Sequence, residues 1–239
     1  MALETYLLAS VAIAVGTCLQ CSLGFGLGLL CAPVLALLEP TLIPGPLLLL
    51  AVAITCVLTV LGRKALQFGE LGWAMAGRVP GTIAAVTLLM FLPTRGLEAF
   101  FGVTVLLAVV LSVLGLRPVV NRPTLVGAGA VSGLMGTAVS TGAAPLAWLL
   151  QERHGDRLRT SLSTFFFAGT ILSITGLTVT GQLGLAQLRD AALLLPGVAV
   201  GAVGSRRAAR ALDPRTTRYA VLGISGLASV GLLVRALIG

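Results

Sequence analysis

Two short segments rich in small residues hold the groups with which this chain could bind a ligand. They read SLGFGLGLLCAP at residues 22–33 and GLMGTAVSTGAAP at residues 133–145. Each holds a glycine nine positions before a proline, namely Gly24 before Pro33 and Gly136 before Pro145. Because each segment stands inside a long apolar run, the pattern predicts a helix that is interrupted within a membrane. An interrupted helix leaves backbone N–H groups free at the start of its second half, and these suit an anion.

Side chains beside the two interruptions would complete such a site. The residues that we expect to contact the ligand lie around the breaks, with one arginine added: Gln20, Ser22, Gly24, Phe25, Gly26, Gly28, Pro33, Arg78, Gly136, Thr137, Ser140, Thr141, Gly142 and Pro145. Gly24 and Gly28 also form a GxxxG motif, which can serve helix packing alone, and this alternative stays open. A nucleotide-binding loop is excluded, because no strand precedes the glycines and no acidic residue follows at the required spacing.

Arg78 is the basic residue that the pattern places inside a predicted span, about two turns from its start. A charge at membrane depth indicates a functional residue by default. An arginine near the cytoplasmic end of a helix can also extend its side chain to the headgroups. Both interpretations, recruitment of an anion and a snorkelling anchor, remain open at this point.

Acidic residues are absent from the middle of the predicted spans. They all fall at segment ends or in loops: Glu4, Glu39, Glu70, Glu98, Glu152, Asp156, Asp190 and Asp213. The sequence therefore lacks the buried carboxylate relay of a proton pump. We expect the anion to move without a dedicated proton carrier in the protein, down its own gradient or together with its own proton.

The sequence gives no pattern of an enzyme or a metal site. His154 is the only histidine, and it lies in a charged loop where solvation is the simplest interpretation. Cys18 and Cys21 form CxxC, but no thioredoxin-like strand and helix surround them, so we interpret them as small apolar packing residues. No serine or cysteine has a buried base as partner. We expect no catalytic residues, no metal and no cofactor.

The composition identifies a membrane protein with several spans. Hydrophobic residues make up 57% of the chain and charged residues 10%, against about 25% charged residues in soluble domains. The apolar runs are continuous rather than alternating, which excludes a transmembrane β-barrel. The net charge of +8 is typical of arginines and lysines that flank membrane helices on the cytoplasmic side. We expect no nucleic-acid partner, because no compact basic domain with interleaved aromatic residues is present.

The apolar runs predict two long segments and six ordinary spans. Their expected ranges are 3–38, 46–61, 71–92, 97–116, 125–150, 161–180, 188–203 and 219–238. Three landmarks recur in the same order in both halves: the Gly-to-Pro segments, a Gln-x-Gly triplet starting at Gln67 and Gln182, and a Pro-Gly pair starting at Pro80 and Pro196. We therefore expect an internal duplication within one membrane domain, with repeats in residues 1–120 and 121–239.

The loop charges bear on whether each long segment crosses once or turns back at its glycine-rich break. If each turns back, one side of the membrane collects most of the basic residues: Arg63, Lys64, Arg117, Arg122, Arg153, Arg157, Arg159, Arg206, Arg207, Arg210, Arg215 and Arg218. If each crosses once, these charges divide between the two sides. Since the positive-inside rule favours the first arrangement, we expect hairpins, inverted repeats and both termini outside the cytoplasm. We expect no cleaved signal peptide, because the N-terminus lacks a basic region and carries Glu4.

With these residues, the chain resembles the TauE/SafE family of membrane proteins, the sulfite exporters, over essentially its whole length. The resemblance depends on LGFGLGLLCAPVLALL near the N-terminus, GLMGTAVSTGAAPLAWLL in the middle, Arg159-Thr160-Ser161-Leu162, and Pro196-Gly197 with Gly201 and Gly204. Two sets of residues match the family's motifs: Gly24, Gly26, Gly28 and Pro33, then Gly133, Gly136, Gly142 and Pro145. Ser140 and Thr141 stand where further glycines are common in the family, which leaves the substrate open.

The resemblance implies export or exchange of sulfite or of a small organic sulfur anion such as a sulfonate. We expect an all-α, polytopic transmembrane helical bundle with two inverted repeats, each a broken or hairpin segment followed by three spans, in the cell inner (plasma) membrane. The expected partners are a small anionic substrate and the lipid bilayer, and formation of a homo-oligomer is left open. Two alternatives remain: a transporter of another small organic or inorganic anion, and a non-transporting membrane scaffold subunit.

Overall fold

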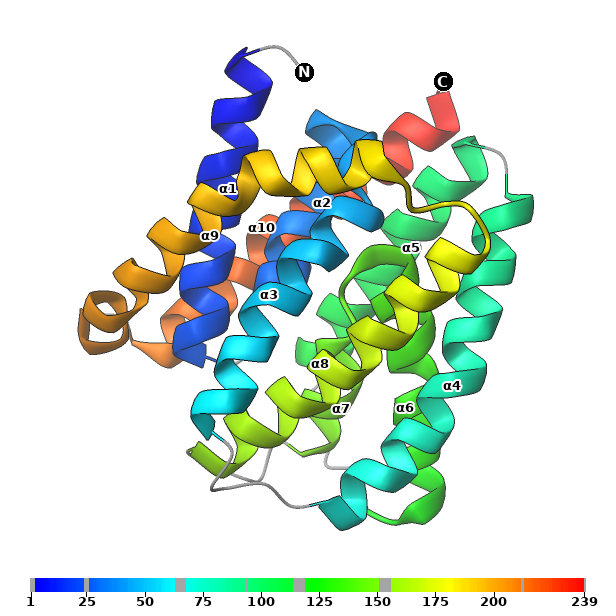
Figure 1. Ribbon diagram of the computed structural model, residues 1–239, viewed down its shortest axis with the longest axis vertical. Helices are drawn as coiled ribbons and strands as arrows, with labels where there is room; N and C mark the ends of the chain where they lie inside the picture. Colours follow the sequence, from blue (N-terminus) through cyan, green and yellow to red (C-terminus); the bar gives the residue numbers. More distant parts are fainter. Residues whose placement is uncertain are drawn as a thin grey trace.

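The computed structural model of the chain describes residues 3–23, 26–62, 68–92, 94–113, 119–150, 156–211 and 213–238, and all regular structure in these residues is helical (Figure 1). The helices are α1 (Leu3–Leu23), α2 (Leu27–Leu38), η1 (Pro40–Leu42), α3 (Gly45–Gly62), α4 (Phe68–Phe91), α5 (Thr94–Val113), α6 (Arg122–Val139), α7 (Ala143–Leu149), α8 (Asp156–Val179), α9 (Leu185–Ala211) and α10 (Pro214–Ile238). Each predicted ordinary span corresponds to one helix, and each predicted long segment is divided into two helices.

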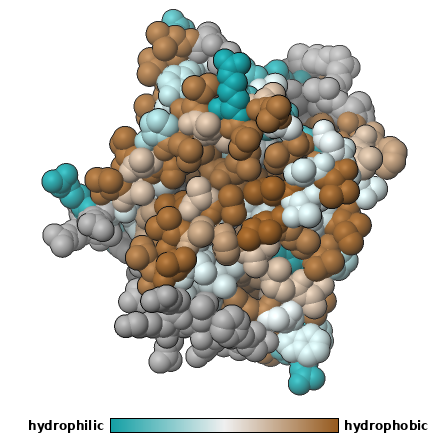
Figure 2. Space-filling view, viewed as in Figure 1, coloured by the Kyte–Doolittle hydropathy of each residue, from teal (hydrophilic) through white to brown (hydrophobic). Residues whose placement is uncertain are grey.

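Six of the described helices are long and apolar enough to cross a membrane, namely α1, α3, α4, α8, α9 and α10. Large apolar side chains on their outer faces are exposed, for example Val11, Ile83 and Leu227. Figure 2 shows that hydrophobic residues dominate one face of the molecule. A continuous apolar exterior is stable in lipid and not in water. The prediction of an all-α membrane protein is therefore confirmed.

Helix α2 turns back along α1 to form a hairpin. The Cys31 thiol donates a hydrogen bond to the carbonyl O of Ala12 at 3.2 Å. Nearer the turn, the site for a Cβ on Gly16 is 3.3 Å from the Cα of Leu27. Contacts that pair later residues of α2 with earlier residues of α1 require antiparallel helices. At 12 residues, α2 is about 18 Å long, shorter than a hydrocarbon core of about 30 Å. It therefore cannot cross the membrane alone.

The second hairpin has the same form with a shorter second arm. Helix α7 contains seven residues, about 10 Å, and packs against α6. The Ser132 hydroxyl of α6 donates a hydrogen bond to the carbonyl O of Gly142, which stands directly before α7. Each of the two long sequence segments thus forms one long helix with a short helix packed against it.

The first five helices and the last five make corresponding contacts. Helix α4 packs on α6, and α9 packs on α1. Helix α3 contacts α8, α5 contacts α10, α2 contacts α10 and α7 contacts α5. Every one of these contacts has its counterpart when α1–α5 are exchanged for α6–α10. Helix α1 begins and α10 ends at the same end of the bundle, the upper end in Figure 1, whereas α4 and α8 begin at the lower end.

Glycines allow the α4–α6 pair to approach backbone to backbone. A Cβ on Gly77 would lie 1.9 Å from the carbonyl O of Val126, and one on Gly81 would lie 2.0 Å from that of Ala130. A step of four residues along α4, from Gly77 to Gly81, corresponds to a step of four residues in the same direction along α6, from Val126 to Ala130. The two helices therefore run parallel. Small residues four apart are the usual means of close packing between membrane helices.

The α1–α9 pair uses the same device. A Cβ on Gly197 would lie 2.8 Å from the carbonyl O of Ser10, and one on Gly201 would lie 2.2 Å from that of Ala14. These two helices also run parallel. The main apolar core then fills the space between the pairs, where Leu35 of α2, Leu47 of α3 and Leu194 of α9 are buried.

The close approach of α4 and α6 can be tested with Gly81→Ala. The added methyl would collide with a carbonyl oxygen, so we expect the free energy of unfolding to fall by about 1–3 kcal/mol, the usual cost of overpacking. Gly127→Ala on α6 is the matched control, because a Cβ there meets nothing within 4 Å. The control should unfold like the parent or slightly later, since alanine favours helices. Equal thermal unfolding midpoints in detergent for the two variants would contradict the packing described.

Candidate functional site

The turn between α1 and α2 is closed by a side chain. Gly26 caps α2 with φ 142°, a backbone conformation that strongly favours glycine. The first N–H of the helix, on Leu27, donates to Oε1 of Gln20 at 3.3 Å. Because this N–H belongs to the first turn of α2, it has no acceptor within the helix, and the buried Gln20 side chain supplies one. Gln20 thus fixes the N-terminus of α2 at its place in the interior.

The turn between α6 and α7 is closed by the backbone. Ser140 adopts the left-handed conformation with φ 58°. Its N–H donates to the carbonyl O of Gly136 at 3.1 Å, and the N–H of Thr141 donates to that of Met135 at 3.3 Å. These bonds satisfy two of the carbonyls left open at the C-terminus of α6.

The two turns lie against each other. A Cβ on Gly28, in the first turn of α2, would stand 1.7 Å from the carbonyl O of Ser140 and 3.2 Å from the Cα of Thr141. Only a glycine can occupy that position without displacing the backbone of the second turn. Residues separated by more than a hundred positions in the sequence therefore bring both helix breaks to one place.

Arg78 extends from α4 toward this place and is buried, with 1% of its surface exposed. Its Nη1 donates to the hydroxyl O of Ser132 at 3.0 Å, and its guanidinium carbon lies 4.8 Å from the ring centre of Phe165. Nε has no hydrogen-bond partner, and no carboxylate among the described residues pairs with the guanidinium. The side chain does not reach the surface, so it does not act as a snorkelling anchor.

Two glycines make room for the guanidinium. A Cβ on Gly169 of α8 would lie 1.8 Å from Nε of Arg78, and a Cβ on Gly136 of α6 would lie 2.8 Å from Nη2. Any larger residue at Gly169 would occupy the volume of the arginine. The absence of a side chain at Gly136 and Gly169 thus leaves the space that the extended, buried side chain of Arg78 occupies.

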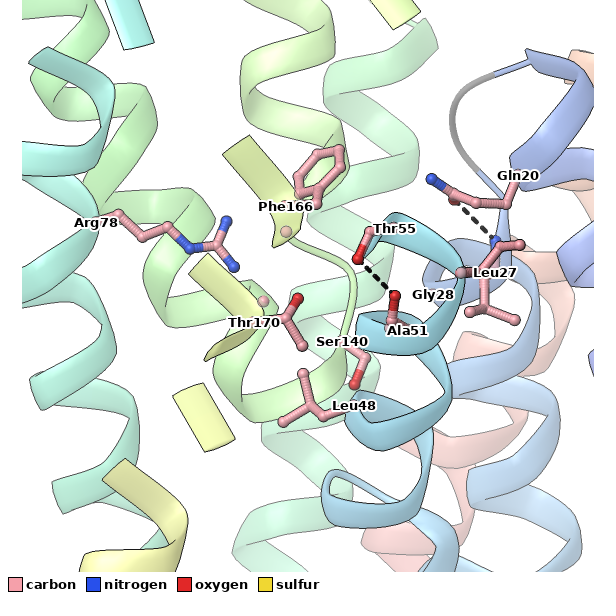
Figure 3. Close-up of a pocket in the computed structure, with 13 residues that line it drawn as sticks. Gln20, Leu27, Gly28, Leu48, Ala51, Thr55, Arg78, Ser140, Phe166 and Thr170 are labelled. Atoms are coloured by element: carbon pink, nitrogen blue, oxygen red, sulfur yellow. Dashed lines mark hydrogen bonds between the residues drawn. The ribbon is translucent and has the colours of Figure 1, made fainter. Parts of the chain in front are cut away.

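A cavity of about 40 Å³ lies where these elements meet, which is room for a few water molecules or one small ion. Its lining comes from α1, α2, α3, α4, α6, the α6–α7 turn and α8: Gln20, Leu27, Gly28, Leu48, Ala51, Ile54, Thr55, Arg78, Gly136, Ser140, Gly142, Phe166 and Thr170. Figure 3 shows Arg78 entering from α4 and pointing toward Thr170 and Ser140, while Gln20 faces it from the side of α1. The lining therefore holds one cation and several hydroxyl groups, and α2 and α3 contribute most of its apolar residues.

The sequence model of the sulfite exporter TauE/SafE family matches residues 8–232. This chain belongs to that family. The match covers almost the whole chain, and the comparison found no matching curated protein and no matching solved structure. TauE/SafE proteins are membrane transporters rather than enzymes, and the family implies a small anion as the exported substrate. The resemblance found in the sequence motifs is confirmed.

The structure of this TauE/SafE protein brings six of the residues expected from the sequence together around the cavity. They are Gln20, Gly28, Arg78, Gly136, Ser140 and Gly142. Six others lie outside its lining: Ser22, Gly26, Pro33, Thr137, Thr141 and Pro145. The two remaining expectations, Gly24 and Phe25, lie outside the described residues.

Several of the residues outside the lining have contacts of another kind. The Ser22 hydroxyl donates to the carbonyl O of Cys18 at 2.8 Å, away from the cavity. Pro33 stands within α2 rather than at a break, and as a proline it cannot donate to the carbonyl O of Leu29. That carbonyl instead accepts a hydrogen bond from Ser225 of α10 at 2.8 Å. In this TauE/SafE protein, Pro33 leaves an acceptor that joins α2 to α10.

Thr137 belongs to a buried hydroxyl cluster beside the cavity. Its Oγ1 lies 2.7 Å from Oγ of Ser173 and donates to Thr82 at 3.3 Å. Ser173 also donates to the carbonyl O of Gly169, the residue that makes room for Arg78. The cluster ties α4, α6 and α8 together behind the arginine.

Sequence reasoning missed the lining residues of two ordinary spans. They are Leu48, Ala51, Ile54 and Thr55 of α3, and Phe166 and Thr170 of α8; Leu27 at the first turn was missed as well. No motif marks α3, and the motif Arg159-Thr160-Ser161-Leu162 of α8 ends before Phe166, so nothing local singled these residues out. The signal that could have found them is the expected duplication, because the spacing of 115 residues from Gln67 to Gln182 also aligns Thr55 with Thr170.

Proposed function

We propose that this chain is a secondary transporter that exports or exchanges a small sulfur-containing anion, such as sulfite or an organosulfonate, through the cavity at the two helix breaks. The observation that carries the proposal is the buried guanidinium of Arg78, which faces the cavity without a carboxylate partner among the described residues. A buried charge without an opposite charge is costly, and an anionic substrate would supply that charge.

The surroundings of Arg78 favour an oxyanion over a neutral ligand. The N-terminus of α2, at Leu27 and Gly28, lines the cavity and contributes the positive end of a helix dipole. Thr55, Ser140 and Thr170 add hydroxyl groups to the lining. A guanidinium fork and the hydroxyl of Ser140, which has no hydrogen-bond partner among the described residues, match the oxygen atoms of sulfite or a sulfonate group.

We further propose that residues 1–120 and 121–239 are inverted repeats. The exchangeable helix contacts support this, and so does the meeting of Gly28 with Ser140, which occupy equivalent positions when Gly24 is aligned with Gly136. Helix α1 begins at the upper end of Figure 1, whereas α6, parallel to α4, begins at the lower end. Movement of one repeat against the other would then open the cavity to each side in turn.

The same arrangement supports a defined orientation in the inner (plasma) membrane. Arg122 begins α6 and Arg157 lies in the first turn of α8, and both helices begin at the end of the bundle opposite the start of α1. The positive-inside rule then places that end in the cytoplasm and both termini outside it.

The proposed function is tested by flux of radiolabelled sulfite into liposomes that hold the purified protein, with protein-free liposomes as the blank. We expect protein-dependent flux that methanesulfonate inhibits. Ser140→Ala should lower this flux without changing thermal stability, because it removes one hydroxyl from the lining. Ser22→Ala, outside the lining, is the matched control and should transport like the parent.

Two results would contradict the proposed function and indicate a different one. Flux of a carboxylate or another oxyanion that sulfite does not inhibit would indicate a carrier for a different anion. A folded protein without flux of any of these anions would indicate a scaffold subunit that uses its glycines only for packing.

A further inference from the structure

We propose that the cavity accepts anions of a single negative charge, so that sulfite is carried as its protonated form, hydrogensulfite, and the proton travels on the substrate. This inference rests on the proposed function and names the ionic species that the site takes. It depends on the charges that surround the cavity and on the composition of its wall.

Arg78 supplies the only formal charge among the described residues that line the cavity. The other polar groups of the lining are neutral: Gln20, Thr55, Ser140 and Thr170, with the backbone at the two turns. A bound monoanion and one guanidinium sum to zero. A bound dianion would leave a net negative charge beside the apolar residues of the lining.

Among the described residues, the helices packed on α4 place no second charged residue in the lining of the cavity. On α6 the titratable residue is Arg122, whose guanidinium carbon lies 5.1 Å from the ring centre of Trp73 and so is engaged elsewhere. On α8 the titratable residues are Asp156, Arg157 and Arg159, all in the first four positions, whereas the lining begins at Phe166. No acidic residue from these helices lies in the lining either.

The elements on the far side of the cavity are also without charge at its depth. On α1 the titratable groups are Glu4, Tyr6 and the thiols of Cys18 and Cys21; on α2 they are the Cys31 thiol and Glu39 at the C-cap; on α3 the Cys56 thiol is the one group of this kind. None of these lines the cavity. The net charge in the cavity therefore depends on Arg78 and the bound substrate.

The apolar residues of the lining strengthen the preference for a monoanion over a dianion. Leu27, Leu48 and Ile54 cover the side of the cavity that belongs to α2 and α3. Hydrocarbon cannot solvate a second charge, but it tolerates the hydroxyl of hydrogensulfite turned toward Thr55, or the methyl group of a short sulfonate. Sulfite and methanesulfonate would thus be bound in the same manner, with charge toward Arg78.

The proton balance of transport follows from this choice of species. Sulfite takes one proton from solution on the side of entry, crosses as hydrogensulfite, and releases that proton on the other side to the extent that the pH there dictates. No residue of the protein has to gain or lose a proton. This agrees with the absence of carboxylates from the predicted membrane interior of the sequence.

The test compares sulfite with methanesulfonate in liposomes that hold the full chain and an internal pH dye. Total sulfite is held constant while the outer pH is raised through and beyond the pKa of hydrogensulfite, and the same series is run with methanesulfonate, which keeps one charge throughout. We expect sulfite flux to fall about tenfold for each pH unit above that pKa, in proportion to the monoanion, while methanesulfonate flux stays constant. Sulfite entry should acidify the interior, and methanesulfonate entry should not. Protein-free liposomes correct for permeation of sulfur dioxide.

A competition series gives the second readout. Methanesulfonate should inhibit sulfite flux, whereas sulfate, a dianion across the whole pH range, should not. Sulfite flux that is constant or rises with pH, or inhibition by sulfate as strong as that by methanesulfonate, would overturn the proposal while leaving anion transport in place. Absence of flux for both sulfite and methanesulfonate would instead overturn the proposed function itself.

Discussion

Arg78→Gln is expected to abolish anion flux and to leave the protein folded. The substitution removes the formal charge from the cavity lining, and loss of a buried charged partner costs about 2–5 kcal/mol of binding, or roughly 30-fold to several thousand-fold in affinity. Folding should survive, because the Ser132 hydroxyl keeps the carbonyl O of Gly142 as its acceptor when the guanidinium is absent. Removal of an unpaired buried charge also lowers the cost of folding. Flux in liposomes and thermal unfolding in detergent measure the two effects separately.

Two further variants show whether the effect belongs to the site. Arg189→Gln on the exposed surface of α9 is the matched control and should transport like the parent. Arg78→Lys keeps the charge but loses the fork that reaches Ser132, so flux should be reduced rather than lost. If Arg78→Gln transported at the parent rate while remaining folded, the buried arginine would have only a structural role. The cavity would then not be the substrate site.

The positions of the helix breaks could be predicted from the sequence because glycine and proline act locally. Gly26 and Ser140 stand within the segments that the sequence singled out, and both have positive φ. The form of each break could not be predicted to the same degree. Pro33 was expected to contact the ligand beside the first break, yet it lies within α2, and the carbonyl that the proline leaves open accepts a hydrogen bond from Ser225. That partner lies almost two hundred residues further along the chain, and no local pattern reveals it.

The candidate site could be predicted only where a residue type was unusual for its surroundings. Arg78 was found because arginine is rare within an apolar span. The side chains of α3 and α8 that complete the lining are threonines and apolar residues, which are ordinary in a membrane helix. Whether such a residue faces lipid, a neighbouring helix or a cavity depends on how the helices rotate against each other. That rotation is set by the close packing of pairs such as α4 with α6, and not by the residue itself.

Gly28→Val is expected to prevent the two hairpins from docking, with a larger effect on stability than any other glycine substitution described above. A Cβ at this position would stand 1.7 Å from a carbonyl oxygen of the second turn. That atom is backbone, and its residue is held in the left-handed conformation by the hydrogen bonds that close α6. No side chain can rotate to relieve the collision, so one turn has to move as a whole. The variant should therefore be recovered in low yield, and what is recovered should unfold at a clearly lower temperature than the parent.

Gly223→Val provides the control, because it makes the same change within α10 at an exposed position where a Cβ meets nothing within 4 Å. Both variants make the same change of intrinsic helix propensity, which is slightly favourable when valine replaces glycine, so any difference between them measures the contact of the two turns. Equal yield and equal unfolding midpoints for the two variants would mean that the turns do not touch in the folded protein. The arginine, the helix N-terminus and the hydroxyl groups would then no longer share one cavity. Docking of Gly28 on the second turn is thus the condition on which the site itself depends.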